Sequence, residues 1–412
     1  MTLPRVVSLG CRLNAAEAAT IEAILREAGD ESTLVVNTCA VTREAERDSM
    51  ATIRRLHREN PGRRIVVTGC AAQLDPSRFA SLDGVDAVVG NRDKLSADVW
   101  QVGAARFGDV MEPQPFVPAD IGLSESRTRA FIEIQQGCDH RCTFCVIPFA
   151  RGPSRSLRPE DAVARVRRAV EAGRREVVLT GVDLTSWGGD LPDRACLGDL
   201  CARILAEVPT LARLRLSSID PAAIDERLFA LFAEEPRLAP FLHLSIQSGD
   251  DLILKRMRRR HSRRQVLEVV ARVRDARPGI AVAADLIAGF PTESDAAFGN
   301  TLALVSDMGL ASVHAFAYSS RPGTAAARMP PLPAGVVQAR AAHLRAAGEA
   351  ARARYLDGRI GDMAEVLVEK SGADGLDAQG TRVRLAASHM RGAIVSARVT
   401  ARDGMHLLAE AA

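Results

Sequence analysis

The residues with the clearest chemical potential are three closely spaced cysteines in the segment "QQGCDHRCTFCVIPFARG". Cys138, Cys142 and Cys145 lie close together in a chain of 412 residues that contains eight cysteines in all. Three thiols at this spacing suit a disulfide framework, a structural zinc site or an iron–sulfur cluster. The rest of the chain must decide between these chemistries.

Zinc and iron–sulfur are the serious alternatives. His140 lies inside the motif and would complete a Cys3His zinc site, but it stands two residues from both Cys138 and Cys142, unlike the usual spacing of paired zinc ligands. Close-spaced cysteines are the usual ligands of iron–sulfur clusters. Three cysteines would leave one iron open to a substrate or cofactor, so the spacing favours a reactive cluster.

Three further cysteines stand at equivalent positions near the N-terminus. Cys11, Cys39 and Cys70 each follow a short β-branched run, "RVVSLG", "TLVVNT" and "RIVVTG" respectively. The carboxyl ends of parallel strands meet at one edge of a sheet, where ligand sites form. Free cysteines are commonly buried core residues, but three at equivalent strand ends favour a shared metal site.

Composition limits the classes of protein. Apolar residues make up 47% and charged residues 25% of the chain, and the apolar runs are too short to span a membrane. The N-terminal segment lacks the pattern of a secretory signal, so we expect a cytoplasmic protein whose thiols stay reduced, which argues against disulfides. The net charge of +3 indicates no partner, and basic charge is local, at 54–64 and 255–264.

The elements that must position these cysteines fall into three groups, and the fold class is α/β. Residues 1–110 alternate short strands with helices near 14–28, 42–59 and 75–81, which predicts an open parallel α/β domain. Six strand patterns alternate with helices over 125–340, which predicts a partial (β/α)6 barrel with its functional loops at the carboxyl ends. A proline-bearing stretch at 111–129 is typical of a linker. Helices at about 334–354 precede short alternating runs over 355–412, which predict a small β-barrel.

The central motif resembles that of the radical S-adenosylmethionine (SAM) enzymes, C-x3-C-x-aromatic-C, at Cys138, Cys142, Phe144 and Cys145. The resemblance implies that these three catalytic cysteines bind a [4Fe-4S] cluster whose open iron holds SAM, with Phe144 near its adenine. Five strand-end residues would provide further SAM contacts. They are Thr180, Gly181, Ser218, Gln247 and Gly289.

Longer segments narrow the resemblance to the radical SAM methylthiotransferase family. They are "SLGCRLN", "VNTCAVT", "VTGCAAQ", "HLSIQSGDDLILKRMRR" and "LIAGFPTES". This family implies a second [4Fe-4S] cluster bound by Cys11, Cys39 and Cys70, a central radical SAM domain, and a C-terminal TRAM domain that binds RNA. SAM would serve as both radical source and methyl donor. The partners would be tRNA and an electron donor such as a flavodoxin or ferredoxin, with no membrane.

Within the family, Arg12 and Leu13 of "GCRLN" are most similar to the MtaB type. That type adds a methylthio group to C2 of N6-threonylcarbamoyladenosine beside the anticodon. The alternatives are the same reaction on isopentenyladenosine or on a ribosomal protein, and, from another class, a non-catalytic RNA-binding protein with structural zinc. The basic run 255–264 would contact tRNA phosphates or form a solvated helix start. Cys196 and Cys201 are predicted to be ordinary buried or half-buried residues.

Overall fold

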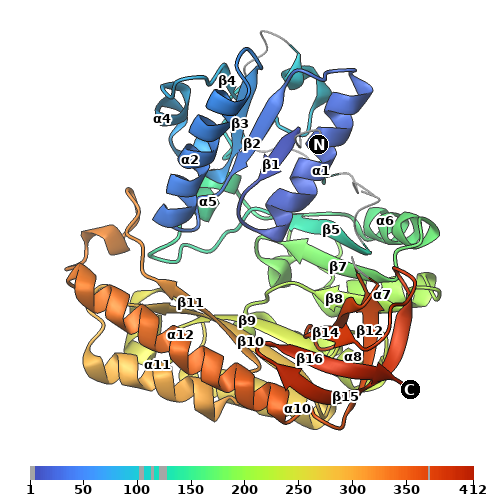
Figure 1. Cartoon of the computed structure of the whole chain (residues 1–412). Coiled ribbons are helices and arrows are strands. Elements are labelled where there is room, and N and C mark those ends of the chain that lie inside the picture. The colour runs from blue at the N-terminus through green and yellow to red at the C-terminus, as the bar shows by residue number, and fades with distance from the viewer. Residues whose placement is uncertain (1–4, 102–105, 113–115, 120–127, 370–371) are drawn as a thin grey trace.

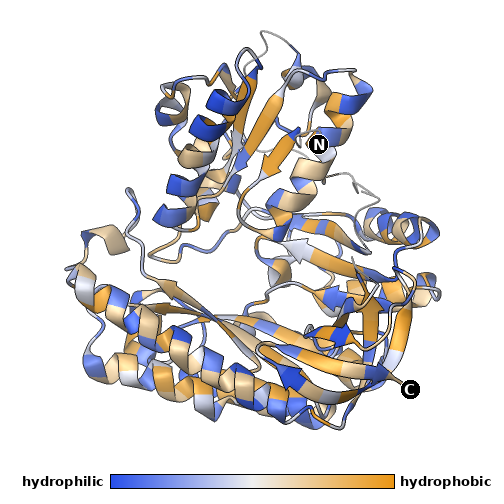
Figure 2. Cartoon of the chain, viewed as in Figure 1, coloured by the Kyte–Doolittle hydropathy of each residue, from blue (hydrophilic) through white to orange (hydrophobic). Residues whose placement is uncertain are grey.

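The β-branched runs near the N-terminus form a parallel sheet, as their composition predicts. The computed structural model describes residues 5–101, 106–112, 116–119, 128–369 and 372–412. Strands β1 (Val6–Ser8), β2 (Leu34–Thr38), β3 (Ile65–Gly69) and β4 (Ala87–Val88) pair in that order, all parallel. The helices between them are α1 (Arg12–Glu27), α2 (Arg43–Glu59), α3 (Cys70–Leu74) and α4 (Pro76–Ala80). The hydrophobic strands lie inside, and α2 is largely hydrophilic (Figure 2).

Six parallel strands form the centre of the molecule, and the prediction of a partial (β/α)6 barrel is confirmed (Figure 1). The strands are β5 (Arg129–Gln136), β7 (Glu176–Gly181), β8 (Arg213–Leu216), β9 (Phe241–Gln247), β10 (Ala281–Ala288) and β11 (Ser312–Ala317). Strands β5, β7 and β8 form one sheet and β9, β10 and β11 another, and a single bridge from Ile219 to Leu244 connects them. The helices of the repeat are α6 (Pro159–Glu171), α7 (Leu197–Glu207), α8 (Glu226–Glu234), α10 (Arg263–Ala276) and α11 (Asp295–Asp307).

Alternation along these strands separates a helix-covered face from an inward face. On β9, Leu242, Leu244 and Ile246 join the large core that includes the surrounding helices. Their neighbours His243 and Ser245 therefore face inward. Helix-facing and inward-facing residues alternate in the same way along the other strands. We call the inward-facing side chains the lumen face.

The C-terminal residues form a closed five-strand barrel, which confirms the all-β prediction. Its strands are β12 (Met363–Val368), β13 (Asp374–Asp377), β14 (Arg382–Leu385), β15 (Ile394–Asp403) and β16 (His406–Ala411). The long helix α12 (Ala334–Asp357) leads into this barrel and packs against β10 and β11. The sequence pattern missed β13, because "ADGLDAQG" lacks the alternation of a strand, and β6 (Arg155–Ser156), because it has two residues.

The C-terminal barrel is anchored to the central one through buried arginines. Arg213 Nη2 donates to the carbonyl oxygen of Glu365 at 2.9 Å, and Arg215 Nη2 donates to that of Asp377 at 3.2 Å. Arg129 forms an ion pair with Glu369 at 2.9 Å. Most of the predicted linker, 111–129, lies outside the described residues. In the part of the chain that the structure describes, no helix combines the length and apolarity needed to cross a membrane.

Candidate metal centres

The first cysteine triad lies in the loop that follows β5, as the sequence predicts. The loop is fixed by backbone bonds from Cys138 N to Gly152 O at 3.0 Å and from Cys145 N to Cys142 O at 3.1 Å. Thr143 between them donates its hydroxyl to the carbonyl oxygen of Arg256 at 2.8 Å, at the end of α9 (Asp251–Arg256). The three thiols are free and half-buried at the carboxyl ends of the strands.

Burial disfavours the thiolate form of two cysteines in this loop. Burial is the main influence that raises the pKa of Cys138 far above its ordinary value, and it raises that of Cys145 to about 12. Thiolates are the ligand form of cysteine, and a bound metal would supply the positive charge that stabilises them in this buried loop. Arg259 Nη1 stands 3.7 Å from Cys142 Sγ and adds a positive neighbour.

His140 does not complete a zinc site with these cysteines. Its Nε2 lies 2.9 Å from Asp183 Oδ2, and among the described residues it belongs to no group of three potential ligand atoms within 4.8 Å of one another. A mononuclear zinc with Zn–S bonds of about 2.3 Å holds its sulfurs about 4 Å apart. Among the described residues, neither triad gathers its three sulfur atoms within 4.8 Å of one another. The wider spacing fits a polynuclear cluster better than a single zinc ion.

The second triad is brought together by the N-terminal sheet. Cys11 immediately precedes α1, Cys39 follows β2, and Cys70 begins α3 directly after β3. Burial, with smaller contributions from Cys70 and Cys11, raises the pKa of Cys39 to about 11. Gly10 (φ 98°) passes so close to Cys39 that a Cβ there would stand 2.5 Å from the sulfur. The strand-end argument placed these three cysteines correctly at one sheet edge.

The two triads approach each other where α5 (Ile147–Arg151), the helix that follows Cys145, contacts α3, the helix that begins at Cys70. Cys11 is exposed to solvent, yet burial is the main influence that raises its pKa, so its thiol lies in a recess and not on an open surface. The charge of Cys70 contributes to the raised pKa of Cys145. Residues of the two triads therefore interact electrostatically although they are 75 positions apart in the chain.

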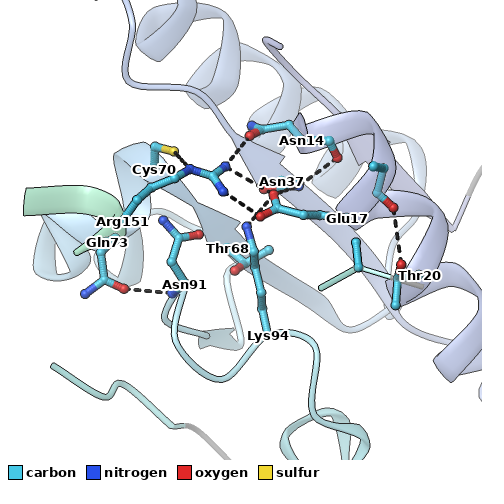
Figure 3. A network of polar contacts seen from close by, with 12 residues as sticks. Asn14, Glu17, Thr20, Asn37, Thr68, Cys70, Gln73, Asn91, Lys94 and Arg151 are labelled. Carbon is cyan, nitrogen blue, oxygen red and sulfur yellow. Dashed lines mark hydrogen bonds and ion pairs between the residues drawn. The ribbon is translucent and has the colours of Figure 1, made fainter. Parts of the chain in front are cut away.

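Arg151 connects the two triads, and sequence reasoning missed it. It ends α5 (Ile147–Arg151), the helix that follows Cys145, and its guanidinium reaches the N-terminal unit (Figure 3). Its Nε donates to Cys70 Sγ at 3.1 Å, and its Nη2 donates to Asn14 Oδ1 at 2.7 Å. Its Nη1 pairs with Glu17 Oε1 at 2.6 Å. The only available signal was an arginine six residues after the last motif cysteine, in a chain with 54 basic residues.

The group around Arg151 is a buried ion-pair network. Glu17 is fully buried and also pairs with Lys94 Nζ at 2.5 Å. Burial opposes ionisation of Glu17, but Arg151 and then Lys94 lower its pKa to about 2. Arg151 therefore connects Cys70 to a buried carboxylate that two cations hold in its ionised form. Buried charges persist only when they are paired in this way.

The six residues predicted to contact SAM lie along the same rim. Phe144 packs with Met257, Ile287 and Phe290 in a hydrophobic cluster at the carboxyl ends of the strands. Thr180 and Gly181 end β7, Ser218 follows β8, Gln247 ends β9 with φ 79°, and Gly289 follows β10 with φ 79°. A Cβ on Gly289 would lie 2.8 Å from Val337, and one on Gly181 would lie 2.9 Å from Gln135 Oε1. The structure thus gathers these residues at one end of the barrel.

Part of the basic run 255–264 makes contacts inside the protein. Arg259 is mostly buried, donates to Ser245 O at 2.6 Å and pairs with Asp220 at 3.2 Å. Arg263 donates to Gly249 O at 3.0 Å. Lys255 and Arg258 are exposed, whereas the exposed Arg264 pairs with Glu268 at 3.1 Å. As predicted, Cys201 is buried in the core, and Cys196 is half-buried at the start of α7.

Comparison with known proteins adds two family matches. Residues 132–305 match the Radical SAM superfamily, and residues 5–90 match the Uncharacterized protein family UPF0004. A "Threonylcarbamoyladenosine tRNA methylthiotransferase MtaB" of Rickettsia prowazekii (strain Madrid E) is 42% identical over 89% of this chain and 87% of its own length. A protein of the same name from Bacillus subtilis (strain 168) is 36% identical over 78% of this chain and 74% of its own length.

A relative with a different printed name and a solved structure also match this chain. A "tRNA-2-methylthio-N(6)-dimethylallyladenosine synthase" of Sorangium cellulosum (strain So ce56) is 34% identical over 89% of this chain and 82% of its own length. Among solved structures, the radical S-adenosylmethionine methyltransferase TsrM of Kitasatospora setae matches with a TM-score of 0.51. That match covers 71% of this chain and 65% of TsrM at 15% identity, so it shows a shared fold alone.

Proposed function

This chain belongs to the MtaB-type radical SAM tRNA methylthiotransferases, and from that premise we propose that it adds a methylthio group to C2 of N6-threonylcarbamoyladenosine beside the anticodon. Membership makes it an enzyme that acts on tRNA and uses SAM with iron–sulfur chemistry. The non-catalytic zinc protein is thereby excluded. The observation that supports the finer proposal is the presence of two separate cysteine triads, with Cys70 of one bonded to Arg151 of the helix that follows Cys145 of the other.

Each triad has its own part in this proposal. Cys138, Cys142 and Cys145 hold one [4Fe-4S] cluster, and a cluster with three cysteine ligands keeps one iron open for SAM. Cys11, Cys39 and Cys70 hold the second. When bound, these cofactors supply the radical that removes the C2 hydrogen and the methylthio group that replaces it. A cofactor radical is needed because acid–base groups cannot substitute an unactivated C2–H bond.

The surrounding residues bind and orient. Phe144, Thr180, Gly181, Ser218, Gln247 and Gly289 contact SAM at the carboxyl-end rim. Arg151 supports the second triad by donating to Cys70 and by fixing α1 through Asn14 and Glu17. We assign residues 1–110 to the second cluster, 125–340 to SAM and the first cluster, and 355–412 to RNA binding. An electron donor such as a flavodoxin or ferredoxin would reduce the first cluster in the cytoplasm.

The direct test uses anaerobically purified protein with SAM, a reductant and tRNA that carries threonylcarbamoyladenosine. We expect nucleoside mass spectrometry to detect 2-methylthio-threonylcarbamoyladenosine. The alternative substrate, isopentenyladenosine, deserves the same assay because relatives named for dimethylallyladenosine are 34% identical. Modification of isopentenyladenosine tRNA or of a ribosomal protein alone would overturn the proposed substrate.

Two cysteine variants separate the proposed clusters. Cys142→Ala should abolish reductive cleavage of SAM. Changing Cys11, Cys39 and Cys70 together to Ala should leave about half of the parental iron, as expected for two clusters of similar size, and should leave SAM cleavage intact without product. Full iron content and continued methylthiolation in the triple variant would show that these three cysteines are merely structural.

A further inference from the structure

A pocket beside the two cysteine triads is not accounted for by the proposed function. It has a volume of about 440 Å³ and lies between α2, α3 and α4 of the N-terminal unit, the start of α5, and the loop that follows β11. Ala40, Ala71 and Val146 contribute to its lining, and each of them directly follows a cysteine of a triad. A molecule seated in this pocket would therefore contact residues that adjoin ligands of both proposed clusters.

The loop after β11 forms one wall of this pocket and joins it to the first triad. Arg321 Nη2 donates to Ala40 O at 2.7 Å, which fixes the loop to the N-terminal unit. Farther along the same segment, Ala326 N donates to the carbonyl oxygen of Thr143, in the loop of the first triad, at 2.8 Å. The pocket wall is therefore hydrogen-bonded both to the N-terminal unit and to the SAM-motif loop.

The pocket carries more positive than negative charge. Its lining includes two carboxylates, Glu46 and Asp75, and four arginines, at positions 43, 47, 78 and 321. Glu46 pairs with Arg78 and, at 2.6 Å, with Arg321, and Asp75 accepts from the backbone N of Arg78 at 3.2 Å. Arg43 and Arg47 are exposed, and their side chains make no hydrogen bond or ion pair with another described residue. Both carboxylates are thus engaged, and two exposed cations remain.

A buried donor in the same pocket also lacks an acceptor. The Arg321 residue is only 6% exposed, and its Nε has no hydrogen-bond partner among the residues that the structure describes. Its Nη atoms are bonded to Glu46 and Ala40. A buried donor without a partner costs stability, so an acceptor that enters the pocket would be bound favourably.

The rim of the pocket adds apolar surface to this charge. Val41, Leu74 and Phe149 are large apolar residues that are exposed. Val41 follows Ala40, Leu74 lines the pocket, and Phe149 N donates to Val146 O at 3.0 Å. Nucleic-acid backbones are bound mainly through cations, whereas protein interfaces combine apolar and charged contacts. The surface therefore favours an acidic protein as its partner over RNA.

We propose that this pocket docks an acidic protein that carries one electron, of the flavodoxin or ferredoxin class, and that Arg43 and Arg47 bind carboxylates on its surface. The proposal rests on the proposed function, which consumes one electron for each SAM that is cleaved. The carrier loses that electron, and the cluster proposed for Cys138, Cys142 and Cys145 gains it. Complementary charge speeds the encounter of such partners, and redox complexes have small interfaces, so the pocket and its rim suffice.

The test reverses two charges in the pocket and two outside it. Arg43→Glu with Arg47→Glu acts near the start of α2, where a carboxylate suits the helix dipole. Arg54→Glu with Arg58→Glu makes the same change at the same spacing, at exposed positions of that helix outside the pocket. Calorimetric titration of iron-replete protein with an oxidised flavodoxin and an oxidised ferredoxin measures affinity at low salt. The pocket variant should bind the carrier at least about tenfold more weakly than the parent, and the control variant should stay within about twofold of it.

The choice of reductant separates docking from reactivity. The reduced carrier should drive SAM cleavage more slowly in the pocket variant than in the parent. Dithionite, a small reductant that needs no docking surface, should drive it at the parental rate in the parent and in both double variants. Arg47→Gln, a milder change, guards against misfolding and should weaken carrier binding about threefold.

Three outcomes overturn the proposal. They are equal carrier affinity in the pocket and control variants, a parent protein that binds neither carrier, and a pocket variant that loses affinity for tRNA but keeps it for the carrier. The last result would make the pocket an RNA site. If carrier binding depends on Arg43 and Arg47 but no methylthio product forms on any tRNA, the docking site stands and the proposed substrate fails.

Discussion

At the scale of single residues, Arg151 joins a candidate metal ligand to a buried ion-pair network in the described structure. It is buried, it donates to Cys70, and it contributes one of the two cations that keep Glu17 ionised. Its loss would leave a buried carboxylate with Lys94 alone and would remove the hydrogen bond to the cysteine sulfur. Hydrogen bonds to cluster sulfurs influence reduction potential, so the effect should reach the cluster that we propose for Cys11, Cys39 and Cys70 as well as the fold.

We therefore expect Arg151→Gln to lower the free energy of unfolding by about 3 kcal/mol, as for a broken buried ion pair. Urea denaturation of the metal-free protein measures this loss without any contribution from cofactors. Arg151→Lys should recover part of the stability, because it restores the charge without the planar set of donors. Arg55→Gln, on the exposed face of α2, is the matched control. Equal stability of Arg151→Gln and Arg55→Gln would contradict the importance of the network.

A second residue-scale prediction concerns Glu133 on β5. Burial, and then the charge of Glu17, raise the pKa of Glu133 to about 7, above an ordinary value near 4.3. Folding therefore favours the protonated acid, and the stability it contributes at acid pH is lost as the pH rises from about 4.5 to 7. Glu133→Gln removes this dependence. Relative to the parent, the variant should gain up to about 3 kcal/mol between pH 4.5 and 8, measured by denaturation at both pH values.

Residue types and spacing predicted where both cysteine triads lie at the strand ends, but none of their charged neighbours. Cysteines 138, 142 and 145 form a local motif, and cysteines 11, 39 and 70 share a position relative to their strands. Arg151 lies 134 residues from Glu17 in the chain, and Arg321 lies 275 residues from Glu46. Such pairs are created by packing between distant segments, so single positions in an arginine-rich sequence carry no signal for them.

At the scale of elements, the loops at the strand ends carry the chemistry. Alternation of β-branched runs and helices was sufficient to predict the N-terminal parallel sheet and the six parallel strands of the central barrel, because periodicity is a local property of the chain. The short helix α3 was not predicted, although it places Cys70 directly after β3. Its five residues are too few to show a helical repeat.

The β1–α1 loop gives a prediction with a matched control. Gly10→Ala would put a methyl group 2.5 Å from Cys39 Sγ at a backbone φ of 98°, so the loop must shift Cys11 or Cys39. The variant should bind about half of the parental iron if the second cluster depends on that loop. Gly29→Ala has a φ of 66° but meets nothing within 4 Å, so it should cost roughly 1 kcal/mol and keep all its iron. Equal iron in the two variants would rule out a cluster at this loop.

At the scale of the whole molecule, the C-terminal barrel supports the central barrel and also provides the surface for which we propose RNA binding. Deleting residues 355–412 would remove the backbone partners of Arg213 and Arg215. It would also expose these charged side chains at the amino end of the central strands. An experiment on the truncated protein would therefore not distinguish a loss of RNA binding from a loss of stability. Point changes on the surface of the barrel are the cleaner test of an RNA-binding role.

The surface best placed for such a test is a basic pocket between β5 and the C-terminal barrel. It has a volume of about 520 Å³, and arginines 129, 382, 384 and 391 contribute to its lining. Arg382 and Arg384 are exposed on β14, where neither supports the buried anchors. The double change Arg382→Ala and Arg384→Ala should weaken tRNA binding at low salt and reduce the slope of log K against log salt by about 1.4 to 1.8, because two phosphates lose their cations. Arg345→Ala, exposed on α12, is the control, and SAM cleavage should be parental in both proteins. If the double variant keeps the parental salt dependence, tRNA does not use this pocket, and the C-terminal barrel serves chiefly to close the base of the lumen.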